Sequence, residues 1–376
     1  MTAPFRVGLD ANARYVSRAG IARYVDGLLA ALPRALPPGA AVFPVAWEHP
    51  NLGYKQPWRM LKTAYREFWW GKVVAPRRLR AGGADVYHAT GAGHYVRVPA
   101  GVRQVATLHD LSVARHPERF RRWQLAMWQR RIAALHRADR VLCSSTFTAD
   151  EAIALLGLSA AKMDVVPLGS DWHAATLKMV EQTPDFPVPA EFLLFVGTLE
   201  PGKNLALLRA VWDAASTTGQ TLPPLLIVGA RRAGVAHEGR PADNWHYLGW
   251  QPDAVLLHLY RRAQALVFPS KYEGFGLPVI EAMAVGCPVV CSPVSSLPEV
   301  AGDAALLTPL DAAAYLESLR ALLRDPSLRA GLIERGRRNA DRFTWAKCAA
   351  ATAASYETAL RNNAPRRSLA PQRPTS

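Results

Sequence analysis

The fold of this 376-residue chain is decided by one stretch of sequence, Ala265-Leu-Val-Phe-Pro-Ser-Lys-Tyr-Glu-Gly-Phe-Gly-Leu-Pro-Val-Ile-Glu281. Its first six residues are an apolar run of strand length, a loop with two glycines follows, and Val279–Val285 has a helical pattern. A strand, a loop and a helix in this order are typical of an open parallel sheet, in which ligands bind at the carboxyl ends of the strands. We therefore expect the loop to face a ligand.

Two glutamates belong to this stretch. Glu273 lies in the loop, and Glu281 falls near the first turn of the predicted helix, so its carboxylate can point back toward the same site. Gly274 and Gly276 would let the backbone approach a ligand closely. A carboxylate can accept hydrogen bonds from two neighbouring sugar hydroxyls, so one glutamate could hold a ribose and the other a hexose. Two solvated glutamates would be the usual interpretation of a random pair, but the glycines and the preceding strand favour binding.

A second loop of the same kind lies upstream. The apolar run 192–197 is followed by Thr198-Leu-Glu-Pro-Gly-Lys-Asn204 and by a helical pattern over Leu205–Ala215. Backbone N–H groups at a helix start and a lysine ammonium together suit a phosphate. Taken alone, the loop is equally consistent with a solvated Lys203.

Short apolar runs alternate with helical patterns along the whole chain, as two doubly wound parallel sheets require. The interval 171–189 loses this period and contains three prolines, so it is predicted to be the linker. We expect a first domain at 1–175, a second domain at 190–345, a helix at 346–364 that packs back on the first domain, and a disordered tail at 365–376. The predicted strands are residues 5–10, 41–47, 85–90, 103–110, 140–144, 163–168, 192–197, 225–229, 246–250, 265–270, 288–292 and 305–308.

The net charge of +15 is concentrated in the first half of the chain. Residues 1–185 hold 25 Lys and Arg against 14 Asp and Glu, whereas residues 186–364 hold 17 against 16. This imbalance predicts that the first domain meets something anionic. A nucleic-acid-binding function is disfavoured, because no binding module of that kind is recognisable.

The four cysteines, Cys143, Cys287, Cys291 and Cys348, have no spacing typical of a metal site or a disulfide framework, and buried thiols are expected. The chain lacks an apolar stretch long enough to span a membrane and starts without a signal-peptide pattern. A cytoplasmic location is therefore predicted.

The stretch Glu273–Glu281 resembles the Glu-x7-Glu signature of the retaining glycosyltransferases of family 4, whose fold, GT-B, has two Rossmann-like α/β domains that face each other across a cleft. Further segments resemble the same family, and together they cover nearly the whole chain. They are Gly20–Val25, Val86–Thr90, Leu108–Asp110, Val165–Gly169, Phe195–Asn204, Tyr247–Trp250, Phe268–Ser270, Glu281–Val290 and Pro298–Gly302.

The resemblance implies roles for individual residues. Lys203 would bind the donor pyrophosphate, Glu273 the transferred sugar and Glu281 the nucleotide ribose. Gly20 would approach the phosphates from the first domain, and His109 would lie beside the anomeric carbon, although a histidine at a strand end can equally have a structural role. The predicted catalytic residues are thus His109, Glu273 and Lys203. The other predicted donor-binding residues are Gly20, Gly197, Thr198, Asn204, Arg231, Gly249, Gly274, Phe275, Gly276, Leu277 and Glu281.

Two positions depart from the family pattern. Gly202 stands where the family commonly has an arginine, so one phosphate-binding cation is missing, and Arg231 or Arg232 is a plausible substitute. Ala22 replaces a glycine inside a predicted helix, which changes little. With no convincing carboxylate nucleophile in the first half, we favour substitution on one face of the sugar through an oxocarbenium-like transition state. Neither a cofactor nor a metal ion is expected, and no Asp-x-Asp pair is present.

Aromatic and basic residues alternate over 54–80, and on a helix they would form an apolar face with a basic edge. This composition is typical of a helix in a membrane interface, although a helix that packs on its own domain is also consistent with it. We expect the first domain to dock on the anionic inner leaflet as a peripheral membrane protein, where a lipid-linked saccharide acceptor would lie. The candidate docking residues are Trp58, Arg59, Lys62, Arg66, Trp69 and Trp70.

The subfamily pattern of the 195–204 loop and of the Gly20 segment resembles bacterial mannosyltransferases of polysaccharide and O-antigen assembly, which favours GDP-mannose as the donor. A UDP-sugar donor remains open. A sugar-nucleotide epimerase of the same fold and a catalytically inactive partner subunit are less favoured, because the full Glu-x7-Glu segment, Lys203 and His109 are all present.

Overall fold

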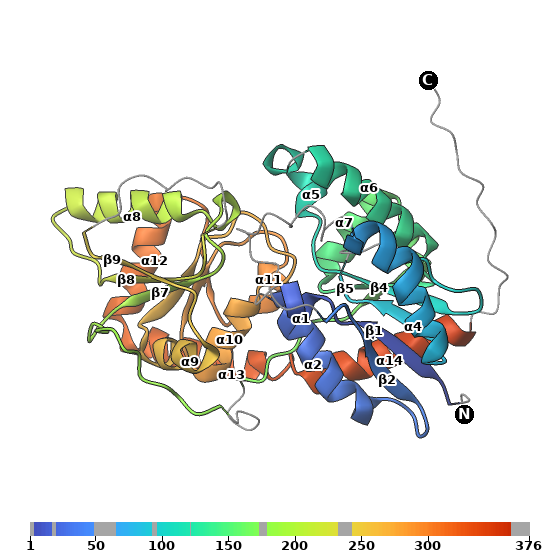
Figure 1. Ribbon diagram of the computed structural model, residues 1–376. Helices are drawn as coiled ribbons and strands as arrows, with labels where there is room; N and C mark the ends of the chain where they lie inside the picture. The colour runs from blue at the N-terminus through green and yellow to red at the C-terminus, as the bar shows by residue number, and fades with distance from the viewer. Residues whose placement is uncertain are drawn as a thin grey trace.

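The computed structural model describes residues 4–16, 20–48, 65–91, 96–120, 122–172, 179–231 and 243–361. The chain forms two domains, each an open parallel sheet with helices on both faces, and Figure 1 shows the first domain on the right and the second on the left. This arrangement confirms the predicted α/β fold with two Rossmann-like domains.

The first sheet has the strand order β2-β1-β3-β4-β5-β6, and every adjacent pair is parallel. Strands β3 and β5 are buried along their whole length, because helices cover both faces of the sheet and leave no polar side. The strand order reverses between β1 and β3, which places the first switch point at their carboxyl ends. The strands are β1 (Arg6–Asp10), β2 (Ala41–Val45), β3 (Val86–Ala89), β4 (Arg103–Leu108), β5 (Arg140–Cys143) and β6 (Met163–Val165).

The second sheet has the order β12-β11-β10-β7-β8-β9 and is also parallel throughout. Its switch point lies between β7 and β10, so the loops that follow these two strands meet at one edge of the sheet. Each of the twelve predicted apolar runs forms a strand, shorter than predicted by one to three residues in most cases. The strands are β7 (Leu193–Val196), β8 (Leu225–Val228), β9 (Trp245–Gly249), β10 (Ala265–Phe268), β11 (Val289–Cys291) and β12 (Leu306–Leu307).

Helices cover the sheets in layers. In the first domain, α2 and α4 lie against β2, and α7 lies against β5. In the second domain, α10 packs beside α9 and α13, and α12 packs beside α8. The first-domain helices are α1 (Ala13–Val16), α2 (Gly20–Ala35), η1 (Tyr65–Val74), α4 (Ala75–Ala81), α5 (Ser112–Arg115), η2 (Pro117–Arg119), α6 (Arg122–Arg137), α7 (Thr146–Leu156) and η3 (Ala160–Lys162). The second-domain helices are η4 (Pro201–Lys203), α8 (Leu205–Thr217), α9 (Asp253–Arg262), α10 (Leu277–Val285), α11 (Leu297–Ala301), α12 (Ala312–Arg324) and α13 (Pro326–Ala340).

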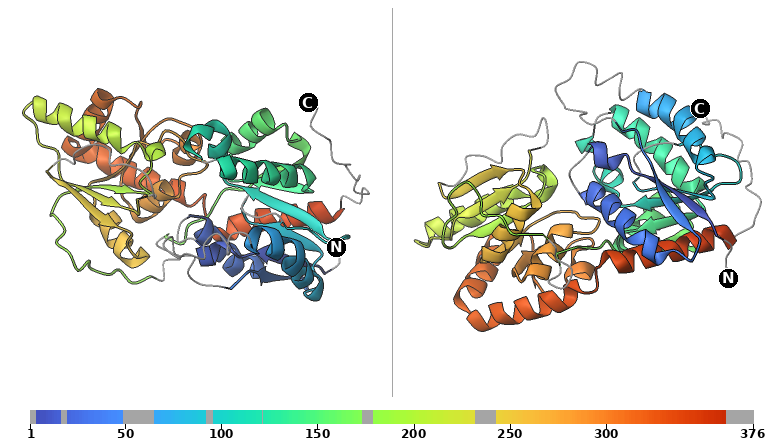
Figure 2. Two further views of the ribbon diagram at one scale, coloured as in Figure 1. Left: turned by 45° about the horizontal axis from the view of Figure 1, so that its top comes forward. Right: turned by 60° about the horizontal axis from the view of Figure 1, so that its bottom comes forward.

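The last described helix, α14 (Trp345–Arg361), follows the second domain in sequence but packs on α2, β4 and β5 of the first. Figure 2 shows it running along the first domain. Close packing at its start requires small neighbours, because a Cβ atom on Gly27 would lie 2.2 Å from the Trp345 ring and one on Gly169 would lie 2.3 Å from the Trp345 nitrogen. Apolar residues of both domains and of α14 form a single core cluster, which ties the two domains together.

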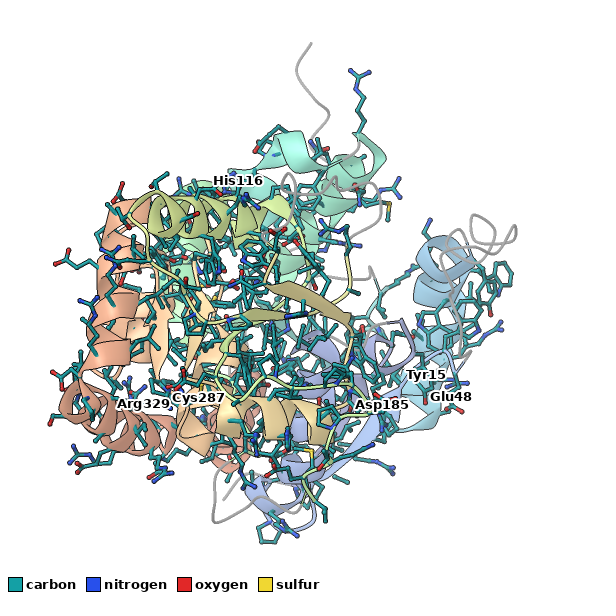
Figure 3. All side chains as sticks on the ribbon, turned by 90° about the vertical axis from the view of Figure 1, so that its left-hand side faces the viewer. Tyr15, Glu48, His116, Asp185, Cys287 and Arg329 are labelled. Carbon is teal, nitrogen blue, oxygen red and sulfur yellow. The ribbon has the colours of Figure 1, made fainter. Side chains whose placement is uncertain are left out.

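All four cysteines are buried and reduced, as expected. Burial raises the pKa of each thiol to about 12, so none is a thiolate at neutral pH. Cys287 lies near Arg329 in the second domain (Figure 3). In the part of the chain that the structure describes, no helix combines the length and the apolar character that crossing a bilayer requires.

The predicted docking helix is described only in part. Trp58, Arg59 and Lys62 lie outside the described residues, as does the side chain of Arg66. The described part, Tyr65–Val74, is a π-helix, in which Trp69 is 55% exposed and Trp70 only 1%. The prediction that Trp70 docks on a membrane is wrong, because consecutive helical residues point in different directions and Trp70 turns into the core beneath the Arg78 guanidinium.

Candidate active site

The two loops at the second switch point bring a cation and a carboxylate together. Lys203, at the end of η4 in the loop after β7, forms an ion pair with Glu273 in the loop after β10. The Lys203 ammonium also lies over the Phe268 ring, 5.2 Å from its centroid. Both charged side chains are more than four-fifths buried, which strengthens their attraction relative to an exposed pair. Lys203, predicted to bind phosphate, and Glu273, predicted to bind sugar, therefore lie in contact at one site.

The phosphate-type loop is held against the neighbouring strand end. The Gly197 N–H donates to the Val228 carbonyl and the Leu199 N–H to the Ala230 carbonyl, at 2.9 and 3.0 Å. Leu199 also forms a β-bridge with Arg231, so the arginine proposed as a substitute for the missing cation lies beside this loop, with its guanidinium 5.7 Å from the Tyr247 ring centroid. Arg232 lies outside the described residues.

Backbone packing behind this loop explains two more of the predicted glycines. A Cβ atom on Gly229 would lie 1.8 Å from the Gly197 carbonyl oxygen, and the φ angle of Gly229 is +147°. The Gly229 N–H donates to the carbonyl of Gly249, whose φ is +66°. Asn204 takes the left-handed φ of 59° that turns the chain into α8. Gly197 and Gly249 thus shape the site through the backbone.

The loop that holds Glu273 is fixed by two serines from the turn between β11 and α11. Ser295 accepts from the Glu273 N–H at 2.8 Å, and the Ser296 hydroxyl donates to the carbonyls of Glu273 and Phe275 at 2.9 and 3.0 Å. Gly276, with φ of 106°, leads directly into α10. The N–H groups at the start of this helix, with Phe275, Gly276 and Leu277 at its entry, remain suitable for an anion or a sugar hydroxyl. Neither serine was singled out from the sequence.

Glu281 lies at the start of the second turn of α10, because the helix begins two residues earlier than predicted, and it is buried. It forms an ion pair with Arg23 of α2, in the other domain, and accepts a 3.4 Å hydrogen bond from the Tyr260 hydroxyl. Arg23 also pairs with Asp253 at the start of α9. Burial raises the pKa of Glu281 and the Arg23 charge opposes that rise. Arg23 belongs to the family-like segment Gly20–Val25, but nothing in its local sequence indicates this role.

The first domain brings Gly20 and His109 to the same loop. A Cβ atom on Gly20 would lie 3.1 Å from the Leu277 side chain, and one on Gly274 would lie 1.8 Å from the His109 carbonyl oxygen. The residue that follows Glu273 is therefore in direct backbone contact with His109. Gly20, His109 and Glu281 thus lie at contacts between the domains, Glu273 is next to one of them, and Lys203 is joined to Glu273 by their ion pair.

His109 is a neutral imidazole with a fixed orientation. Its Nε2 lies 2.8 Å from the Thr90 carbonyl oxygen, so Nε2 carries the proton and donates it. The ring packs edge-on against Tyr24, with centroids 4.9 Å apart. Burial lowers the pKa of His109, which keeps the ring uncharged near neutral pH. A neutral imidazole suits positioning of a sugar better than donation of a proton to it.

A buried chain of hydrogen bonds supports the Tyr24 ring. The Tyr24 hydroxyl lies 2.8 Å from Thr107 Oγ1, which lies 2.7 Å from His88 Nε2. His88 Nδ1 in turn lies 2.7 Å from the hydroxyl of Tyr356 on α14. Burial, aided by His109, lowers the pKa of His88 to about 3. These hydrogen bonds could not be predicted from the sequence, because their members come from four elements and share no spacing.

The described part of the chain contains no group of three or more His, Cys, Asp or Glu side chains that could hold a metal ion.

Comparison with known proteins assigns the family. Residues 18–172 match the family model Glycosyltransferase Family 4, and residues 179–339 match Glycosyl transferases group 1. The chain is 32% identical over 272 residues to O-antigen chain mannosyltransferase B of Escherichia coli, which covers 68% of this chain and 70% of that protein. The chain belongs to glycosyltransferase family 4.

A second relative of this glycosyltransferase is longer than the chain. The chain is 27% identical over 291 residues to the serotype-specific mannosyltransferase WbdA of Escherichia coli, and this match covers 70% of the chain but only 35% of WbdA. Its structure is similar to that of sucrose-phosphate synthase from Thermosynechococcus elongatus, with a TM-score of 0.70 at 20% identity, over 94% of this chain and 98% of that one. This second likeness confirms the GT-B fold.

Proposed function

We propose that this glycosyltransferase moves a hexose, with retention of configuration, from a nucleotide sugar to a saccharide acceptor and needs no metal ion or cofactor. The observation that carries the proposal is the backbone contact between Gly274 and His109. This contact brings Glu273, the predicted sugar ligand of the second domain, to the histidine predicted to lie beside the anomeric carbon.

The ion pairs of the ligand-free site suggest how a donor binds. A pyrophosphate would take over the Lys203 ammonium, and this exchange would free the Glu273 carboxylate for the hydroxyls of the sugar. Arg231 lies near enough to the same loop to supply the cation that Gly202 does not. Glu281 would accept hydrogen bonds from the ribose hydroxyls. The ribose would either replace Arg23 as the partner of Glu281 or bind while this ion pair stays in place.

In the transfer step, the bond between the anomeric carbon and the phosphate oxygen breaks while the acceptor oxygen attacks from the same face. The leaving phosphate oxygen takes the acceptor proton, so no enzyme group has to gain or lose one. Lys203 and the N-terminus of α10 would stabilise the charge that develops on the phosphate. Neutral His109 would orient the sugar and exclude water.

GDP-mannose is the donor we favour. Two relatives are mannosyltransferases by name, and one of them is an O-antigen chain mannosyltransferase, which supports mannose as the sugar and a cell-surface polysaccharide as the product. A thermal-shift panel of GDP-mannose, GDP, UDP-glucose and UDP tests the donor, because a ligand at 100 times its Kd stabilises the folded protein by about 2.7 kcal/mol. Stabilisation by the UDP compounds alone would contradict the choice.

The reaction itself is tested with the best-binding donor and short mannosides as acceptors. We expect a glycoside whose anomeric configuration equals that of the donor, formed equally well with and without EDTA. Epimerised donor in the absence of acceptor, or an inverted product, would contradict the proposal.

The acceptor we favour is linked to a lipid on the cytoplasmic face of the inner membrane. The exposed Trp69 lies in η1, which leads directly into the basic helix α4, where Arg77 and Arg80 are also exposed. An exposed tryptophan followed by a helix with exposed arginines suits an anionic lipid surface. Flotation with phosphatidylglycerol liposomes should be reduced by the triple variant W69A/R77A/R80A and left intact by the matched variant R335A/R338A on α13. Absence of flotation by the unaltered protein would contradict membrane docking.

A further inference from the structure

The loop that presents Glu273 is held by the first domain on both sides of that glutamate. On one side, the hydroxyl of Tyr272 donates to Glu151 of α7 at 2.6 Å and accepts from the Leu111 N–H at 2.9 Å. Glu151 is 4% exposed and pairs also with Arg115, so its carboxylate is a fixed acceptor. Tyr272 therefore anchors the Glu273 loop to the first domain at Leu111, which is two residues after His109.

On the other side, the Gly274 carbonyl enters a group of hydroxyls at the start of α7. Ser144, Ser145 and Thr148 point their hydroxyls at this oxygen, at 2.9, 2.9 and 3.2 Å. Ser144 is 2.9 Å from the His109 carbonyl as well. One buried serine thus links the backbone of His109 to the residue that follows Glu273.

A third contact comes from α11 of the second domain. The Glu299 carboxylate accepts from the Thr146 N–H at 2.9 Å, from the Thr146 hydroxyl at 3.0 Å and from the Phe147 N–H at 3.4 Å. These N–H groups lie in the first turn of α7, an eleven-residue helix, where the helix dipole favours a negative charge. Thr146 and Phe147, the partners of Glu299, are not part of the predicted donor site.

We propose that Tyr272, Ser144 and Glu299 form an interdomain latch that positions Glu273 against His109 when the two domains close. The latch rests on the proposed transfer reaction and adds positioning residues to it. Lys203 and Glu281, which would hold the donor, lie outside the latch, so loosening the latch should affect the transfer step more than donor binding. Misplacement of reacting groups by about 1 Å can slow a reaction a hundredfold.

The test uses the conservative variants Y272F and E299Q in the full-length protein. Y272F removes only the hydroxyl that joins Glu151 and Leu111, and E299Q replaces the carboxylate by an uncharged amide of the same shape. Matched controls are Y65F, on a tyrosine that packs against Trp47, and E334Q, on the exposed face of α13. Small-angle scattering should give a larger radius of gyration for the latch variants than for the controls, because weaker contacts leave the domains open for more of the time.

In transfer assays, we expect kcat to fall tenfold or more for Y272F and E299Q while the donor KM changes less than threefold, and donor hydrolysis should rise relative to transfer. An unchanged radius of gyration together with unchanged kcat would overturn the latch, whatever the donor. If no nucleotide sugar supports transfer by the unaltered protein, the proposed function fails but scattering still decides the latch.

Discussion

Arg23 of the first domain forms an ion pair with Glu281, the carboxylate of the second domain that is expected to hold the nucleotide ribose. Arg23 also pairs with Asp253, and its guanidinium lies over the Trp172 ring. Removal of one member of a buried pair leaves the other charge uncompensated. The state of a donor-binding residue is therefore set partly by the opposite domain.

The first prediction concerns this pair. In R23Q, burial and the nearby Asp253 charge act on Glu281 without the opposing Arg23 charge, so the pKa of Glu281 rises further. A larger fraction of Glu281 is then protonated and accepts ribose hydroxyls poorly. We expect calorimetry to show donor binding weakened at least tenfold, which is about 1.4 kcal/mol, with a smaller loss at pH 8 than at pH 6. R14Q, which removes a surface partner of Asp26, is the matched control. Tighter binding would instead show that Arg23 competes with the ribose.

A second prediction separates Lys203 from a neighbouring lysine. In K203M, the cation for the donor phosphates is lost, and the Kd for the preferred nucleoside diphosphate should rise about tenfold to a hundredfold, as expected for one charge-assisted hydrogen bond. K271M changes the same kind of residue on the adjacent loop, where the side chain is exposed, and should bind almost normally. Equal losses in the two variants would mean that only the general positive charge of the region matters.

The third prediction is a pH dependence of stability. The pKa of His88 is lowered to about 3 in the fold, below its usual value of 6.5, so the unfolded chain binds this proton first as pH falls. The stability due to neutral His88 is therefore complete above pH 6.5 and is lost as pH falls toward 3, with a decrease of about 3 kcal/mol between pH 6.5 and pH 4.

Urea denaturation as a function of pH measures this effect. In H88Q, the unfolding free energy should depend less steeply on pH in this window. The decrease in slope should correspond to about one bound proton, whatever the effect of the substitution on stability at neutral pH. H246Q, at an exposed position on β9, is the control that should keep the slope of the unaltered protein. A slope that stays the same in H88Q would show that His88 is not responsible.

A fourth prediction tests the backbone contact behind the phosphate loop. In G229A, the new Cβ would lie 1.8 Å from the Gly197 carbonyl, so the 197–204 loop must move, and we expect the free energy of unfolding to fall by about 4 kcal/mol together with a loss of nucleotide binding. G219A has a positive φ of 66° but open space around it, and it should cost only about 1 kcal/mol. Similar stability of the two variants would contradict the steric argument.

The sequence alone determined the fold and the reaction family. Its apolar runs correspond to the twelve strands, because strands buried on both faces leave an uninterrupted hydrophobic record that local sequence preserves. Gly20, His109, Lys203, Glu273 and Glu281 could be named because each lies in a segment that resembles the family. The first four follow a strand or open a helix, and Glu281 lies in the second turn of α10.

Only the tertiary structure decided which charges compensate one another and what holds the two domains together. Arg23 and Glu281 are 258 residues apart in sequence, and Ser144 and Gly274 are 130 apart. Contacts over such separations depend on how the domains dock, and no local period encodes that docking. Trp70 illustrates the same limit. The aromatic and basic composition of its segment suited a membrane surface, but Trp70 is buried in the core, where the Arg78 guanidinium lies over its ring.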